Sequence, residues 1–181
     1  MSDLSFTIRL CEPNDTMRIV PLIQAQVAAS GRYAPDPDQL TELVHALLIS
    51  QFSDFLLAEV DGQALGVMQI NYRLSTWEVA PYAVIEDFYL APQLRGQGVG
   101  PRMLDYACGR AEGRGSTFVE AALHPEDRAA RRLYQQFGFL DTPRSVWRRD
   151  LPFDCAIPLD DLAGEAETNA GDPYDAAGAR A

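Results

Sequence analysis

The feature that most restricts the fold is a tight-turn signal between two apolar runs. Residues 55–60 and 64–72 are mostly apolar, and Asp61-Gly62 stands between them. An Asp-Gly pair favours the left-handed backbone of a two-residue hairpin turn. The sequence therefore predicts an antiparallel β-hairpin at this point of the chain.

Further strands and helices are predicted on both sides of the hairpin. Apolar residues recur with a period of two in the predicted strands and at helical spacing in the predicted helices. A strand at 6–10 is followed by helices at 17–29 and 38–48, the hairpin strands 55–60 and 64–72, a loop at 74–81 and a strand at 82–90. Then come a helix at 99–112, a strand at 117–123, a helix at 126–137 and one or two final strands within 139–151.

The net charge of the chain favours some classes of binding partner over others. It has 26 acidic and 15 basic residues, giving a net charge of −11. An acidic field repels phosphate backbones, so we expect no nucleic-acid partner and favour a cationic ligand. All basic residues are arginines, which excludes Schiff-base and P-loop lysine chemistry.

The acidity is concentrated at the end of the chain. Residues 150–181 hold eight acidic residues against Arg180, and Tyr174 is the only aromatic residue beyond Pro158. Such a composition buries too little apolar surface to offset the entropy of ordering. We predict one domain over residues 1–157 and an acidic, disordered tail over 158–181.

The cysteines and the start of the chain indicate the compartment. Cys11, Cys108 and Cys155 are odd in number and far apart, which fits neither a disulfide framework nor a zinc site. The first residues lack the basic region of a leader peptide, and no run reaches the ~18 apolar residues of a membrane span. We expect a cytoplasmic protein with free thiols, no metal and no membrane partner; a homodimer is compatible with these patterns.

The strongest chemical signal lies in residues 86–100, Glu-Asp-Phe-Tyr-Leu-Ala-Pro-Gln-Leu-Arg-Gly-Gln-Gly-Val-Gly. This pattern indicates a strand, a turn marked by proline and a glycine-rich start of a helix. Free backbone N–H groups at the positive end of a helix hold phosphate, and glycine has no Cβ to keep a pyrophosphate away. A plain loop or helix cap is the alternative. A dinucleotide-binding fold would need this motif after the first strand.

Two motifs in this order resemble those of the GNAT family of N-acetyltransferases. The resemblance covers roughly residues 4–150 and includes the strand order. In two positions the sequence departs from the family: Asp127 replaces the usual Asn, and Pro101 removes an N–H that often faces the pyrophosphate. The acyl-CoA signature is matched by Arg95, Gly98 and Gly100, and the second motif by Ala130, Leu133, Tyr134, Gly138 and Phe139.

The resemblance implies an α/β GNAT fold and a bound acetyl-CoA. The sheet would be mixed, mostly antiparallel, flanked by helices and splayed between its fourth and fifth strands. The pyrophosphate would meet the amides of residues 96–100, and the pantetheine would pair with the backbone of residues 88–90. The implied cofactor-binding residues are Phe88, Tyr89, Leu90, Arg95, Gly96, Gln97, Gly98, Val99, Gly100 and Asp127.

Transfer of an acetyl group to an amine also needs a base, an oxyanion donor and an acid. Glu86 is the expected base, acting directly or through a water, because the amine must lose a proton; a structural ion pair is the alternative. Asp87 is expected on the opposite face of the strand. The N–H of Leu90 or Tyr89 would stabilise the oxyanion, and Tyr134, unless it is only a core residue, would protonate the thiolate.

We therefore expect an N-acetyltransferase acting on a primary amine of a small cationic acceptor. Trp77, Tyr82 and Asp87 would bind the ammonium group, which aromatic and acidic side chains attract. The segment around Glu86 is closest to the diamine and polyamine acetyltransferase branch. A polyamine, diamine or basic amino acid analogue comes first and an aminoglycoside next. Protein or peptide N-acetylation and a non-catalytic acyl-CoA-binding or partner-binding module are the alternatives.

The predicted tail can be tested by truncation. A chain ending before Leu159 should keep its melting temperature, because the removed residues contain few apolar groups. Thermal unfolding followed by circular dichroism measures this. A fall of many degrees would mean that the tail docks on the domain.

Overall fold

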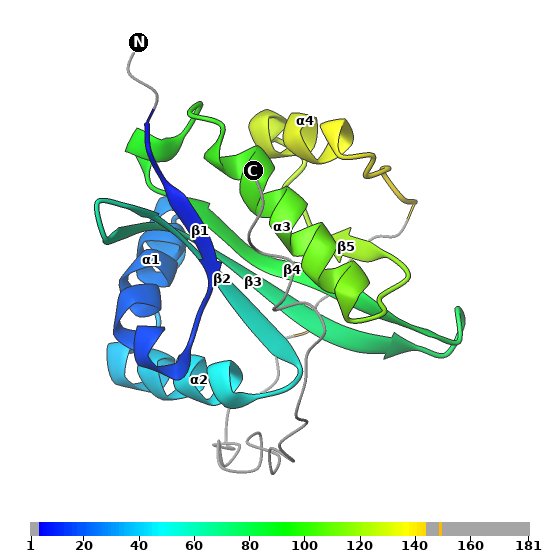
Figure 1. Ribbon diagram of the computed structural model, residues 1–181, viewed down its shortest axis with the longest axis horizontal. Coiled ribbons are helices and arrows are strands. Elements are labelled where there is room, and N and C mark those ends of the chain that lie inside the picture. The colour runs from blue at the N-terminus through cyan, green and yellow to red at the C-terminus, as the bar shows by residue number, and fades with distance from the viewer. Residues whose placement is uncertain (1–3, 144–148, 150–181) are drawn as a thin grey trace.

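The predicted hairpin is the centre of the sheet. The computed structural model describes residues 4–143 and 149. Asp61 and Gly62 have φ values of 49° and 77°, the left-handed conformations that a tight hairpin turn requires. The elements, shown in Figure 1, are β1 (Thr7–Leu10), η1 (Pro13–Asp15), α1 (Thr16–Ala29), α2 (Pro37–Ile49), β2 (Ser53–Val60), β3 (Gln63–Ser75), β4 (Ala80–Leu90), η2 (Pro92–Leu94), α3 (Val99–Gly113), β5 (Val119–Ala121) and α4 (Arg128–Gln136).

The five strands form one mixed sheet in the order β1-β2-β3-β4-β5. Neighbouring strands are antiparallel except for β4 and β5, which are parallel. Helices flank this sheet, as the sequence predicted. The predicted α/β fold with a mostly antiparallel sheet is therefore confirmed.

Alternation along the strands places a separate apolar core on each face of the sheet. Phe55, Leu57 and Val67 pack against α1 and α2. Their neighbours Leu56 and Met68 point to the other face and pack against α3, together with Tyr134 of α4. Both faces are therefore covered, which explains why β2 and β3 are continuous apolar runs.

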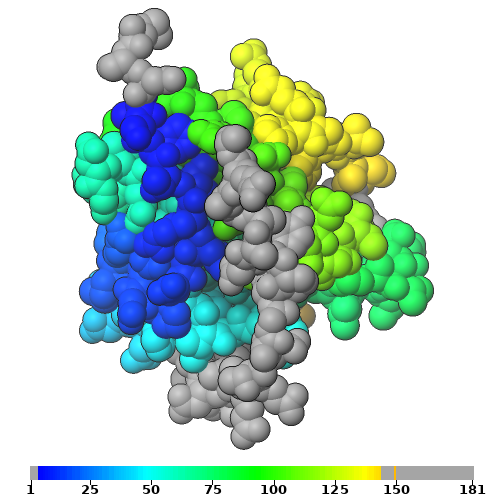
Figure 2. Space-filling view, in the orientation of Figure 1, coloured from blue at the N-terminus to red at the C-terminus, as the bar shows by residue number. Residues whose placement is uncertain are grey.

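The predicted loop between the third and fourth strands is too long, for a physical reason. The predicted loop 74–81 includes the ends of two strands, since Ser75 pairs with Ala80 and only residues 76–79 form the turn. This β3–β4 arm extends beyond the helices (Figures 1 and 2), so its side chains are exposed and show no alternating burial pattern.

The one or two final strands predicted over 139–151 are only partly within the described residues. Residues 139–143 form no strand, and 144–148, 150 and 151 lie outside the described residues, as does the predicted tail 158–181. Phe139 instead packs edge-on against Tyr134, with ring centroids 4.9 Å apart. Phe139 is therefore apolar because it packs against α4, and not because it belongs to a strand.

The parallel pairing of β4 with β5 is short. It ends at the pair Ile85 and Ala121, whereas β4 continues to Leu90 and stays paired with β3. Residues 86–90 therefore have one edge without a neighbouring strand among the described residues. This open edge is the splay that the family resemblance implied between the fourth and fifth strands.

Candidate active site at the open edge of strand β4

The hydrogen-bond pattern of β3 and β4 shows which backbone groups face the open edge. The N–H of Ala91 donates to the carbonyl of Leu65 at 2.8 Å, so this pair is hydrogen-bonded. Antiparallel pairs alternate between bonded and non-bonded, which places Tyr89 in the next bonded pair. Phe88 and Leu90 then direct their N–H and C=O groups toward the splay. Of the two expected oxyanion donors, Leu90 has its N–H on the open side and Tyr89 does not.

Arg95 ties the loop after β4 back to this edge. Its Nε donates to the carbonyl of Leu90 at 3.0 Å, and its guanidinium lies 6.0 Å from the ring centroid of Tyr89. The first contact agrees with a Leu90 backbone that faces away from β3. Arg95 therefore fixes the turn that leads into the glycine-rich loop.

The glycine-rich loop presents free amides at the start of α3. Gly96 and Gly98 have φ values of 74° and 79°, and Gly98 is the N-cap of the helix. No group within the described residues accepts a hydrogen bond from the amides of Gly96, Gly98, Val99 or Gly100. The positive end of α3 adds to this arrangement, which suits a pyrophosphate.

The glycines of this loop have different structural roles. A Cβ on Gly98 would meet no atom within 4 Å, so the space above it is open to a ligand. A Cβ on Gly100 would lie 3.4 Å from Leu133 of α4 and 3.5 Å from Leu90. Gly100 therefore lies where α3 meets α4 and β4, and a Cβ there would make ordinary van der Waals contacts. Pro101 lies in the first turn of α3, where its missing N–H has no intrahelical partner to lose.

Asp127 and Gln97 take up local contacts. The carboxylate of Asp127 accepts from the N–H of Ala130 at 2.9 Å and caps α4. A carboxylate caps a helix as well as the amide of Asn, so the departure at this position leaves the helix start intact. The N–H of Gln97 donates to the carbonyl of Leu94 at 3.3 Å, and its side chain is exposed.

A β-bulge in β4 controls the direction of the acidic pair. Met68 pairs with Phe88 and Ile70 pairs with Ile85, so two residues of β4 oppose the single residue Gln69. These two residues are Glu86 and Asp87. A bulge interrupts the alternation of side chains and re-aims them.

Both carboxylates consequently face the side of α1 and α2. Asp87 accepts a hydrogen bond from Nε2 of Gln26 in α1, at 3.0 Å. Glu86 forms an ion pair with Arg73 of β3 at 2.5 Å, on the face that also carries Gln69. The prediction that Asp87 faces away from Glu86 is wrong, because it assumed an unbroken strand.

The two carboxylates have different electrostatic surroundings. Burial raises the pKa of Asp87, the negative charge of Glu86 raises it further, and the hydrogen bond from Gln26 partly opposes the rise. Glu86 is exposed, and its charge is compensated by Arg73. Asp87 is thus the less hydrated of the two carboxylates, and its pKa lies above that of an ordinary aspartate.

Tyr134 lies in the core on the opposite face of the sheet. It is 3% exposed and sits in α4, and burial raises the pKa of its phenol. The phenol therefore keeps its proton at neutral pH. This agrees with a core position and also leaves a proton available for a leaving group.

The expected acceptor-binding aromatic residues lie farther out along the arm. Tyr82 stacks on Phe118 with ring centroids 4.8 Å apart, and it is four strand residues, or about 13 Å, from Glu86. Trp77 is 89% exposed in the turn at the end of the arm. The structure thus brings Asp87 to Glu86 but leaves Trp77 at a distance.

Gln26 and Arg73 were missed in the sequence. Ile19, Ile23 and Gln26 follow each other at helical spacing on α1, so a polar side chain continues an apolar stripe. That break in the pattern was the available signal for Gln26. Arg73 had no signal, since it lies in the arm where exposure removes the periodicity.

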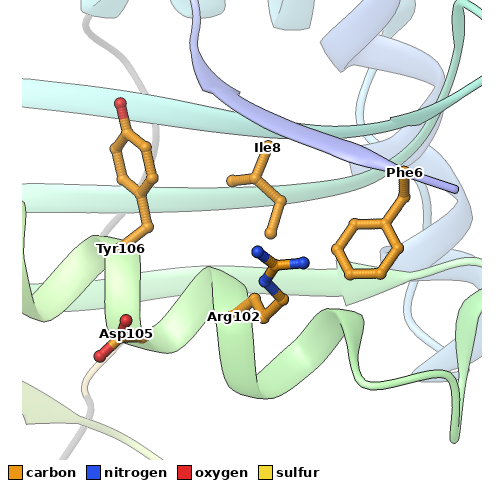
Figure 3. Close-up of a pocket in the computed structure, with 5 residues that line it drawn as sticks. All are labelled: Phe6, Ile8, Arg102, Asp105 and Tyr106. Carbon is orange, nitrogen blue, oxygen red and sulfur yellow. The ribbon is translucent and has the colours of Figure 1, made fainter. Parts of the chain in front are cut away.

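Other features of the described residues are separate from this site. A cavity of about 250 Å³ lies between β1 and α3 (Figure 3), and none of the site residues discussed above lines it. The cavity is lined by Phe6, Ile8, Arg102, Asp105 and Tyr106.

The cysteines show no sign of a disulfide within the described residues. Cys11 and Cys108 are free thiols, while Cys155 lies outside the described residues. Within residues 4–143 and 149, no group of His, Cys, Asp or Glu could hold a metal, and no helix has the length and apolar character needed to cross a membrane.

Comparison with known proteins identifies the family. Residues 23–139 match the model of the acetyltransferase (GNAT) family. The chain therefore belongs to this family, and it is an acyl-CoA-dependent N-acetyltransferase. GNAT acetyltransferases use acetyl-CoA, and the open edge of β4 and the free amides at α3 fit that molecule.

Relatives cover most of the chain. YhfO, an uncharacterised N-acetyltransferase of Bacillus subtilis (strain 168), is 28% identical over 132 residues, which are 73% of this chain and 88% of YhfO. An aminoglycoside N(6')-acetyltransferase type 1 of Stenotrophomonas maltophilia is 29% identical over 122 residues, 66% of this chain and 80% of the relative. A solved putative acetyltransferase from Arthrobacter sp. FB24 has a TM-score of 0.71 and 26% identity, covering 80% of this chain and 96% of that one.

The cofactor loop can be tested at Gly98. Gly98→Glu should abolish acetyl-CoA binding in calorimetry, because it places a bulky anion where the pyrophosphate would lie. Gly115→Glu is the matched control, since Gly115 also has a positive φ, 77°, but follows the other end of α3. If a folded Gly98→Glu variant binds acetyl-CoA with unchanged affinity, the cofactor does not bind at this loop.

Proposed function

We propose that the acceptor is a primary amine on a small cationic molecule. The observation that carries this proposal is the pair of carboxylates, Glu86 and Asp87, placed on one face by the bulge beside the open edge of β4. Polyamines, diamines, basic amino acid analogues and aminoglycosides all carry the ammonium groups that such a pair attracts. The similarity to the aminoglycoside acetyltransferase of S. maltophilia supports the aminoglycosides within this class.

Acetyl-CoA supplies the acetyl group when it is bound, and the chain supplies its position. We propose that the amides of residues 96–100 hold the pyrophosphate and that the backbone of Phe88 and Leu90 pairs with the pantetheine. The N–H of Leu90 then donates to the carbonyl oxygen on which negative charge develops. The free backbone groups described above support these roles.

Proton transfer is assigned to two side chains on opposite faces of the sheet. An amine with a pKa near 10.4 costs about 4–5 kcal/mol to deprotonate at neutral pH, so the acceptor needs a base. Glu86 accepts this proton, directly or through a water, and Tyr134 donates a proton to the departing thiolate. Trp77 and Tyr82 on the arm are proposed to contact the distal parts of a larger acceptor.

The cytoplasmic location and the homodimer predicted from the sequence remain proposals. Leu74, Trp77 and Val79 are more than four-fifths exposed at the tip of the arm, which supports burial of this apolar surface in a second copy. Light scattering of the purified chain measures the oligomeric state.

The base can be tested with Glu86→Gln, which keeps the shape but removes the basicity. The value of kcat/KM at neutral pH should fall by roughly 10²–10⁴, and activity should partly recover at high pH, where the free amine needs no base. Glu78→Gln, an exposed carboxylate of the same arm, is the control. If only the KM of the acceptor rises while the pH–rate profile stays parallel to wild type, Glu86 anchors the acceptor and is not the base.

The acid can be tested with Tyr134→Phe, which keeps the ring in the core. This change should lower kcat with little effect on acetyl-CoA binding, because the proton is needed only as the thiolate leaves. Tyr106→Phe, an exposed tyrosine of α3, is the control. Steady-state kinetics with a panel of amines and calorimetry with CoA supply both measurements; an unchanged kcat would leave Tyr134 a core residue.

A further inference from the structure

We propose that Gln26 and Asp87 together form a binding subsite for an ammonium group of the acceptor, in which Gln26 is also the positioning residue for Asp87. This inference rests on the proposed function, and it adds a residue of α1 to the acceptor site. Three independent observations support it: an unpaired oxygen, an unpaired charge and a polar residue in an apolar stripe.

The unpaired oxygen belongs to Gln26. Its Nε2 donates to Oδ1 of Asp87 at 3.0 Å, while its Oε1 is buried and has no hydrogen-bond partner within the described residues. The second oxygen of Asp87, Oδ2, also accepts no hydrogen bond from them. Buried acceptors are normally paired. An ammonium group has three N–H donors, so it can donate to more than one such oxygen.

The unpaired charge belongs to Asp87. Other carboxylates withdrawn from solvent in this fold have arginine partners: Asp15 pairs with Arg9, and Asp54 pairs with Arg110. Asp87 forms no ion pair within the described residues, and Arg73 is engaged by Glu86. A partly buried carboxylate without a cation is costly unless a ligand supplies one.

The position of Gln26 on α1 completes the argument. The residue continues the stripe of Ile19 and Ile23, where an apolar side chain would pack against the sheet. Gln26 meets β4 at the bulge, next to Phe88, where the backbone begins to face the splay. A polar residue in this stripe and a bulge in the facing strand thus converge beside the expected reaction site.

The subsite has a definite pH dependence. Burial and the charge of Glu86 raise the pKa of Asp87, and the hydrogen bond from Gln26 lowers it. Within the described residues, Glu86 with its partner Arg73 is the charged neighbour on the sheet, and α1 contributes the uncharged Gln26. Only the ionised form of Asp87 attracts a cation. Affinity for an ammonium group should therefore fall as the pH drops through this raised pKa.

Two substitutions of Gln26 test the proposal. The probes are kanamycin and spermidine, titrated calorimetrically into the complex of the enzyme with CoA, so that no turnover occurs. Gln26→Leu should weaken probe binding roughly tenfold, since a hydrogen bond to a charged group is lost. It should also shift the acid limb of the affinity–pH curve to higher pH, because the contribution that lowers the pKa of Asp87 disappears.

Gln26→Glu keeps the size of the side chain and adds an anion. It should shift the acid limb in the same direction by like-charge repulsion, yet restore affinity at higher pH. Gln24→Leu is the matched control: Gln24 is also half-buried on α1, and it should leave both the affinity and the pH curve unchanged. Asp87→Asn should abolish the acid limb of the affinity–pH curve, because it removes the carboxylate that titrates. This variant replaces the Gln26 variants in the test if one of them does not fold.

The outcomes separate this inference from the proposed function. If wild type acetylates the probes and the Gln26 variants bind them with unchanged affinity and pH dependence, the subsite is wrong and the function stands. If the probes bind in a way that depends on Gln26 but no acetyl group is transferred to any amine, the subsite stands and the acceptor class is wrong. If neither probe binds, the subsite is overturned.

Discussion

The site depends on the point where β4 and β5 stop pairing. Their ladder ends at Ile85, and β4 continues to Leu90 with one edge free within the described residues. Backbone polar groups need partners, so an unpaired edge beside a packed core is tolerated only where water or a ligand supplies them. In the proposed function, the pantetheine arm, which contains amides, meets this requirement. Beyond this divergence α3 begins with N–H groups that have no partner within the described residues.

The bulge in β4 is the second constraint, and it acts on the acceptor side. Without the extra residue, strand alternation would turn either Glu86 or Asp87 into the α3 core, where a carboxylate without a partner is costly. With it, both carboxylates face α1 and α2, while Phe88 still packs in the core. The neighbours then differentiate the pair: Arg73 compensates Glu86, and Gln26 holds Asp87. Two like residues adjacent in sequence thus acquire different partners and different exposure to solvent.

Local signals predicted most of the fold, and tertiary contacts explain what they missed. The turn at Asp61-Gly62 and the start of α3 at Gly98 follow from backbone preferences of a few residues, so the sequence was sufficient. The bulge has no such signal, because it exists only as a difference in length between two paired strands. The contact of Gln26 with Asp87 joins residues 61 positions apart and becomes visible only after α1 is docked on the sheet. The roles of the predicted site residues stay predictions.

The two faces of the sheet give the proposed reaction a direction. Glu86 and Asp87 lie on the side of α1 and α2, whereas Tyr134 belongs to the core on the side of α3 and α4. In the proposed mechanism the amine therefore approaches the carbonyl from one face of β4, and the thiolate leaves toward the other. The N–H of Leu90 lies at the edge between them, in line with the sheet. In this proposal, a single strand with one free edge lies between the group that takes a proton and the group that gives one, so the two do not exchange a proton directly.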